Sequence, residues 1–180
     1  MKTLLNNTQL DLTLQRLAHQ LVENHNNFAN TAIIGVQPRG VALSDRIMAA
    51  LKKITRKKDI DYGCLDITFY RDDVYKTGDI VVPNKTDINF SIEGRKVVLI
   101  DDVLYTGRTI RSAMDALLDF GRPSSVELLV LVDRRFSREL PIQPDYIGYT
   151  VDTILTQKVK VCWQEQDGKD EVVLIDKGQL

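Results

Sequence analysis

The sequence has few of the residues that build disulfide frameworks or zinc sites. It contains only two cysteines in 180 residues, Cys64 and Cys162, which are far apart and outside any Cys-x-x-Cys or Cys/His grouping. This spacing argues against a disulfide framework and a structural zinc site. The two histidines, His19 and His25, are six positions apart on one predicted helix, whereas ligands of a shared metal must lie on one helical face. We therefore expect reduced cysteines, and histidines that serve as surface or packing residues.

The chain also lacks an excess of positive charge and a long apolar run. Lys and Arg total 24 against 25 for Asp and Glu, so bulk positive charge does not hold the protein to nucleic acid or membrane, although a local basic patch is still allowed. No apolar run is long enough to span a bilayer, and the segment from Met1 to Asn7 lacks the continuous apolar core of a signal peptide. With 43% hydrophobic residues, the composition is not that of a disordered chain. We expect a cytoplasmic protein with no membrane contact and a single domain over residues 1–180.

Alternating helix and strand patterns predict an α/β fold with a mostly parallel central sheet flanked by helices. Leucines at positions 10, 14, 17 and 21 have helical spacing, and Thr8 with Asp11 resembles a capping box. The order strand, loop, helix, strand between Val97 and Val132 predicts a βαβ unit with parallel strands. Further strands are predicted at 31–36 and 62–70, and further helices at 41–51 and 109–120.

Two other segments have a distinct character. Residues 71–93 form a long polar connection, which predicts a lid or a hairpin. Residues 158–163 and 172–175 flank Asp167-Gly168 and predict a C-terminal hairpin at an antiparallel edge.

The residues after the buried strand at 97–100 are the strongest candidate for chemistry, because ligands of open parallel sheets bind outside the carboxyl ends of the strands. This segment reads Asp101-Asp102-Val103-Leu104-Tyr105-Thr106-Gly107-Arg108-Thr109. Adjacent carboxylates at a strand end need partners such as a polyhydroxyl ligand, a metal or hydrogen-bond donors, although a helix cap with an exposed acid is the plainer alternative. The glycine, the two hydroxyls and the free N–H groups of the helix start suit a phosphate. No Walker A or GxGxxG motif is present, so the combination indicates a ribose 5-phosphate.

The segment Val97–Thr109 resembles the phosphoribosyl pyrophosphate (PRPP) signature of type I phosphoribosyltransferases. Residues 66–73, 121–125, 138–141 and 145–148 further resemble the PyrR family, pyrimidine operon attenuation proteins that are also uracil phosphoribosyltransferases. The resemblance implies the type I phosphoribosyltransferase fold, with a flexible lid at about 71–93 and a small C-terminal hood or hairpin at about 150–180. It also implies transfer of ribosyl 5-phosphate from PRPP to uracil, giving UMP and pyrophosphate, with Mg²⁺ on the diphosphate.

The resemblance assigns roles to individual residues. It implies that Asp101 and Asp102 hold the ribose hydroxyls directly or through Mg²⁺, and that Arg39 donates to the diphosphate. Arg71 would reach the pyrophosphate when the lid closes, although an ion pair with Asp72 or Asp73 is nearly as good an interpretation. The catalytic residues are thus expected to be Asp101, Asp102 and Arg39, and the full PRPP or nucleotide site to comprise Pro38, Arg39, Gly40, Arg71, Asp101, Asp102, Val103, Leu104, Tyr105, Thr106, Gly107, Arg108 and Thr109. Uracil is expected against the backbone of residues 151–155.

The chain departs from the family pattern at two places. Pro38 stands where the family's pyrophosphate loop usually has Thr, which removes a hydroxyl and an N–H donor. Residues 134–138 form a segment one residue longer than is usual in the family.

The resemblance also implies a second function of a different class. A homodimer would bind the leader mRNA of its pyr operon with UMP as co-regulator, through a basic face that includes Arg16 and His19. Asp11, Leu12, Asn24, Gln143 and Tyr149 do not keep this basic character, and each lost phosphate contact weakens RNA binding. A solvated role for Arg16, a salvage enzyme without RNA binding, and a transferase for another base remain alternatives.

Overall fold

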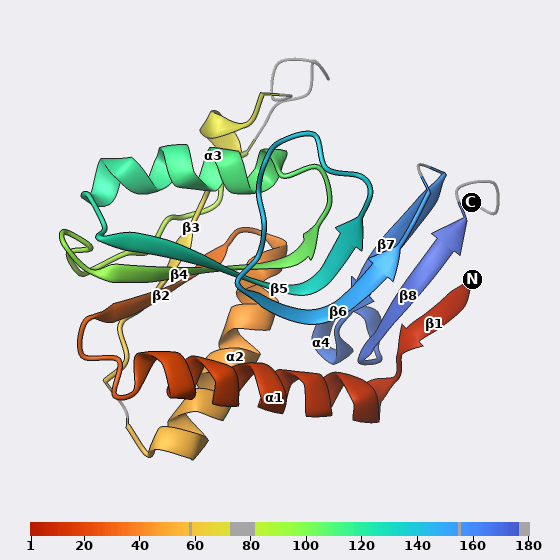
Figure 1. Ribbon diagram of the computed structural model, residues 1–180, viewed down its shortest axis with the longest axis horizontal. Coiled ribbons are helices and arrows are strands. Elements are labelled where there is room, and N and C mark those ends of the chain that lie inside the picture. The colour runs from red at the N-terminus through yellow and green to blue at the C-terminus, as the bar shows by residue number, and fades with distance from the viewer. Residues whose placement is uncertain (58, 73–81, 155, 177–180) are drawn as a thin grey trace.

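Five parallel strands form the central sheet of the computed structural model (Figure 1). They are β2 (Thr31–Val36), β3 (Tyr62–Leu65), β4 (Lys96–Leu104), β5 (Ser125–Arg135) and β6 (Tyr146–Asp152). Their spatial order is β3-β2-β4-β5-β6, and each neighbouring pair is parallel. The predicted α/β class and the βαβ unit between β4 and β5 are therefore confirmed. The acid pair predicted from the sequence lies on β4, the central strand.

Helices cover both faces of this sheet, as a parallel sheet requires. The helices α1 (Asn7–His25) and α2 (Arg39–Thr55) lie on one face, and α3 (Arg108–Leu117), continued by the 3₁₀ turn η2 (Leu118–Phe120), lies on the other (Figure 1). Because successive strand residues point to opposite faces, Ile33 and Val98 pack in the core with α1 and α2, whereas Ile34 and Leu99 pack with α3.

A second, antiparallel sheet has the order β1-β8-β7 and lies beside the carboxyl end of the central sheet (Figure 1). It consists of β1 (Lys2–Leu5), β7 (Gln157–Cys162) and β8 (Glu171–Asp176), with the short helix α4 (Gln164–Asp167) between β7 and β8. The predicted hairpin is confirmed. It forms a separate sheet with β1 rather than an edge of the central sheet, because Val159, Val161 and Val172 join Leu5 in the core under α1 and α2.

Some local predictions were wrong. The N-cap of α1 is Asn6 and not Thr8: the Asn6 side chain accepts from the Gln9 N–H (2.9 Å), and the Gln9 side chain accepts from the Asn6 N–H (3.0 Å). The strand predicted at 62–70 ends at Leu65. The Asp66 carboxylate accepts from the backbone N–H (3.1 Å) and hydroxyl (2.6 Å) of Thr68, which turns the chain into the 3₁₀ turn η1 (Thr68–Tyr70). Strand β6 was not predicted from the sequence.

The structure describes residues 1–57, 59–72, 82–154 and 156–176. The predicted lid at 71–93 therefore lies partly outside the described residues, as does the end of the predicted hood. No helix in the described ranges is long and apolar enough to cross a membrane.

Candidate active site

Asp101 and Asp102 lie near the carboxyl end of β4 and are each only 6% exposed. The Asp102 N–H donates to an Asp101 carboxylate oxygen (2.9 Å). Burial raises the pKa of Asp101 well above its usual range, and the neighbouring Asp102 carboxylate raises it further, while the guanidinium groups of Arg39 and Arg71 lower it. Burial also raises the pKa of Asp102, against the opposing charge of Arg39. The pair therefore needs cations or donors to remain ionised.

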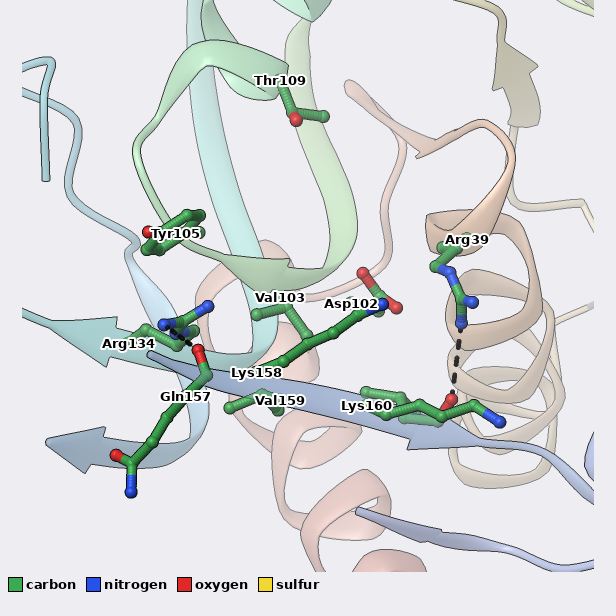
Figure 2. A pocket seen from close by; sticks show the side chains of 11 residues that line it. Arg39, Asp102, Val103, Tyr105, Thr109, Arg134, Gln157, Lys158, Val159 and Lys160 are labelled. Atoms are coloured by element: carbon green, nitrogen blue, oxygen red, sulfur yellow. Dashed lines mark hydrogen bonds between the residues drawn. The ribbon is translucent and has the colours of Figure 1, made fainter. Parts of the chain in front are cut away.

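Two adjoining cavities meet at these carboxylates. The larger, of about 550 Å³, extends from Arg39 and Asp102 to Tyr105 and Arg134 (Figure 2). The smaller, of about 230 Å³, is lined by Pro38, Arg71 and Asp101 among others. Arg39, Asp102, Val103 and Thr109 line both cavities. The tertiary structure thus brings together side chains from three distant parts of the predicted PRPP site.

The loop before α3 has the geometry of an anion-binding turn. Gly107 has φ of 92° and precedes the helix, in a conformation that side chains rarely adopt. The Thr106 carbonyl accepts from the N–H groups of Glu139 (3.0 Å) and Leu140 (3.1 Å), which ties the loop to the segment after β5. The first N–H groups of a helix have no partner within the helix, and its dipole favours negative charge there. This loop is therefore suited to bind a phosphate next to the acid pair.

Not all predicted site residues face the cavities. The Arg108 guanidinium pairs with Glu139 (2.6 Å) and with Asp72, so a phosphate at this loop would meet the backbone of Arg108 rather than its side chain. Leu104 is a buried core residue. Gly40 is a packing residue: a Cβ there would be 2.3 Å from the carbonyl oxygen of Ile100. Asp73, one partner considered for Arg71, lies outside the described residues.

The start of α2 forms the opposite wall of the site. Arg39 is the first residue of the helix, and its Nη1 donates to the carbonyl of Val161 on β7 (3.5 Å). The preceding Gln37–Pro38 peptide bond is cis. Arg39 therefore stands between the acid pair and the second sheet.

Comparison with known proteins identifies the family. The family model for the phosphoribosyl transferase domain matches residues 1–166. The chain belongs to the phosphoribosyltransferase family. Within it, the chain belongs with the PyrR proteins: it is 48% identical to the "Bifunctional protein PyrR" of Elusimicrobium minutum over 94% of this chain and 93% of that one. It is also 43% identical to the PyrR of Deinococcus radiodurans, over 99% of this chain and 96% of that one.

Solved phosphoribosyltransferase structures share the fold. A hypoxanthine phosphoribosyltransferase from Staphylococcus aureus superposes with a TM-score of 0.72 at 19% identity, over 100% of this chain and 95% of that one. The hypoxanthine phosphoribosyl transferase of Trypanosoma cruzi superposes with a TM-score of 0.72 at 17% identity, over 99% and 93% of the two chains. These matches confirm the predicted type I phosphoribosyltransferase fold.

The site of this phosphoribosyltransferase also contains residues that sequence reasoning missed. Strand β7 closes the larger cavity from Gln157 to Val161, and Arg134 closes its far end (Figure 2). Of the segment predicted to contact the base, Thr153 touches Arg134, and Leu155 lies outside the described residues. The alternating pattern of β7 is visible in the sequence, but its position over the cavity depends on pairing with β8.

The segment at 134–138, which is predicted to be one residue longer than in the family, is anchored at both of its ends. Arg134 is buried, and Arg138 donates to the Tyr105 carbonyl (2.5 Å) and pairs with Asp133 (2.5 Å). Phe136 between them has φ of 64° and is 82% exposed. Phe136 therefore points away from the protein interior, while both flanking arginines contact Tyr105 of the active-site loop.

The donor set fits a magnesium ion that arrives on a phosphate. Among the described residues, no group of three or more His, Cys, Asp or Glu side chains could hold a metal ion by itself. Mg²⁺ is usually bound by one or two carboxylates together with substrate phosphates and water. Asp101 and Asp102 supply two carboxylates beside an anion-binding loop. Because burial raises their pKa values, a cation bound there would keep them ionised.

Proposed function

We propose that the protein transfers the 5-phosphoribosyl group of PRPP to uracil, forming UMP and pyrophosphate. The observation that carries this proposal is the meeting of a buried acid pair, a helix N-terminal loop and Arg39 at two adjoining cavities. Membership of the PyrR group supports uracil as the acceptor, because residues 66–73, 121–125, 138–141 and 145–148 resemble the PyrR family, whose members are also uracil phosphoribosyltransferases.

The chemistry matches the charges of the site. Departure of pyrophosphate leaves positive charge on the ribose ring, which carboxylates near the sugar stabilise. Asp101 and Asp102 hold the ribose hydroxyls, the backbone and hydroxyls of residues 106–109 hold the 5-phosphate, and Arg39 and Arg71 neutralise the diphosphate. Mg²⁺, when bound with the diphosphate, would withdraw charge from the leaving group, and Asp101 and Asp102 would contact it. Strand β7 excludes water from the reacting carbon.

The direct test is an assay of the purified protein with PRPP, Mg²⁺ and uracil, with UMP and pyrophosphate both quantified. Orotate and hypoxanthine are assayed in parallel under the same conditions. We expect stoichiometric UMP and pyrophosphate from uracil. Absence of UMP, or faster turnover of orotate or hypoxanthine, would contradict the assignment.

We also propose that the protein binds pyr leader mRNA as a homodimer in a UMP-dependent way, because its curated relatives are called bifunctional. His19 is exposed on α1 and remains a candidate RNA contact. Arg16 already donates to the carbonyls of Ile147 (3.2 Å) and Gly148 (2.6 Å), so a phosphate would compete with β6 for its guanidinium.

A gel-shift titration with leader RNA, with and without UMP at two salt concentrations, tests the RNA proposal, and sedimentation tests the dimer. We expect UMP to tighten binding and salt to weaken it. Turnover of uracil without UMP-dependent RNA binding would indicate a salvage enzyme alone.

A further inference from the structure

The larger cavity has two ends of different chemistry. One end has Asp102 and Arg39, which the proposed function assigns to the sugar and the diphosphate. The other end has the Tyr105 ring and the Arg134 guanidinium, with the apolar side chains of Val103 and Val159 between the ends (Figure 2). If the ribose lies at the acid pair, a flat base attached to it extends across the valines toward Arg134.

Arg134 is a buried side chain with a positive charge. It is only 5% exposed, and no carboxylate among the described residues lies within ion-pair distance of it. Its Nε donates to the Thr153 hydroxyl (3.0 Å) and its Nη2 to the Gln157 carbonyl (2.9 Å), and its guanidinium lies 3.9 Å from the centroid of the Tyr105 ring. A guanidinium has five N–H donors, so these contacts leave donors available at the cavity.

We propose that Arg134 determines base preference by donating a hydrogen bond to the C4 carbonyl oxygen of the pyrimidine. The inference rests on the proposed function and deepens it. The glycosidic bond forms at N1 of the pyrimidine, and C4 lies directly across the ring from N1. A base whose N1 is at the acid end of the cavity therefore presents its C4 substituent to the end where Arg134 lies.

The chemistry of the C4 substituent then separates two classes of pyrimidine. Uracil has a carbonyl oxygen at C4, which accepts from a guanidinium. Cytosine has an amino group there, and a guanidinium has no acceptor to offer it. Because Arg134 is buried, water has little access to solvate a donor that the base leaves unmatched. The site therefore favours dioxopyrimidines and rejects aminopyrimidines.

The test compares UMP with CMP binding by calorimetry, alongside uracil turnover, for wild type and Arg134→Gln. A glutamine carboxamide both donates and accepts, so it tolerates either C4 substituent. We expect Arg134→Gln to lower the UMP-to-CMP affinity ratio by about 10- to 150-fold, the range for a hydrogen bond to a charged group. The KM for uracil should rise while the KM for PRPP stays within about threefold, since Arg134 is remote from the diphosphate end.

A control variant separates base recognition from a general effect of losing an arginine. Arg135→Gln removes the neighbouring exposed arginine, which pairs with Asp152 (2.8 Å) outside the cavity, and should leave the ratio unchanged.

The outcomes distinguish the two proposals. A wild-type protein that neither binds UMP nor turns over uracil would refute the proposed function. A wild-type protein that prefers UMP, with an Arg134→Gln variant that keeps the same preference, would refute only the role of Arg134. Equal loss of UMP and CMP binding in Arg134→Gln would assign Arg134 a purely structural role and would also overturn the inference.

Discussion

Replacing Gly40 with alanine would place a methyl group between the first turn of α2 and the end of β4. The added Cβ would be 2.3 Å from the carbonyl oxygen of Ile100 and 3.1 Å from the Cα of Asp101, both of them backbone atoms that no side-chain rotation can move. The helix start must therefore separate from β4. Arg39 precedes Gly40 and Asp101 follows Ile100 in the chain, so these two side chains would move apart.

The size of the expected losses in rate and stability follows from this overlap. Ordinary contact requires a displacement of about 1 Å, and a misplacement of that size costs about 100-fold in rate when it separates catalytic groups. Overpacking of this kind also destabilises a protein by about 1–3 kcal/mol, which corresponds to a Tm decrease of about 2–12 °C for a chain of this length. We expect Gly40→Ala to lower kcat/KM for PRPP about 100-fold, measured as UMP formation at a temperature where the variant remains folded.

Gly94→Ala is the matched control. A Cβ at Gly94 meets no atom within 4 Å, but its φ of 68° strains any side chain, so alanine costs stability without altering packing. Gly94 precedes β4 and lies at the end of that strand opposite the acid pair. We expect a comparable decrease in Tm with wild-type kcat/KM. Wild-type kinetics in folded Gly40→Ala would refute the claim that contact between α2 and β4 sets the catalytic geometry.

Three further outcomes are expected from the buried titratable groups. Asp102→Asn should lower kcat/KM for PRPP by about 10- to 1000-fold, and an unchanged kcat/KM would remove the acid pair from the mechanism. The Tm of this variant at neutral pH should equal or exceed that of wild type, because burial raises the pKa of Asp102 and disfavours its charge. Because the pKa of Asp101 is raised, this group binds a proton more tightly in the folded state than in the unfolded state, so it adds stability as the pH falls from neutral. Activity declines over the same range, because the carboxylate is lost. Tm and kcat/KM measured across this pH range should therefore change in opposite directions. Burial lowers the pKa of His25 below 6.5 despite the contact of its ring with Glu127, so the stability that neutral His25 contributes is lost as the pH falls below 6.5. The Tm of His25→Gln should therefore approach that of wild type at acidic pH. A Tm difference that stays constant with pH would contradict this expectation.

The parts of the site that are contiguous in the chain were predictable. The buried run before Asp101, the helix after Gly107 and the right-handed βαβ connection together placed an acid pair beside an anion-binding turn, because hydrophobic periodicity and turn chemistry act over a few residues. The partners of the Arg108 side chain could not be predicted in this way. The structure pairs this side chain with Asp72 and Glu139, which are 36 and 31 positions away in the chain.

Sequence patterns by themselves determined the α/β class, the strand that bears the carboxylates and the family resemblance, since each depends on neighbouring residues. Only the tertiary structure decided that β1 pairs with β8, that β7 covers the cavity and that Arg134 closes its far end. The physical reason is that these contacts join segments more than 20 residues apart, and they form because Leu5, Val159 and Val172 bury their apolar surfaces in one shared core. Many pairings of such strands satisfy the local pattern equally well, and the packing of the whole chain selects one of them.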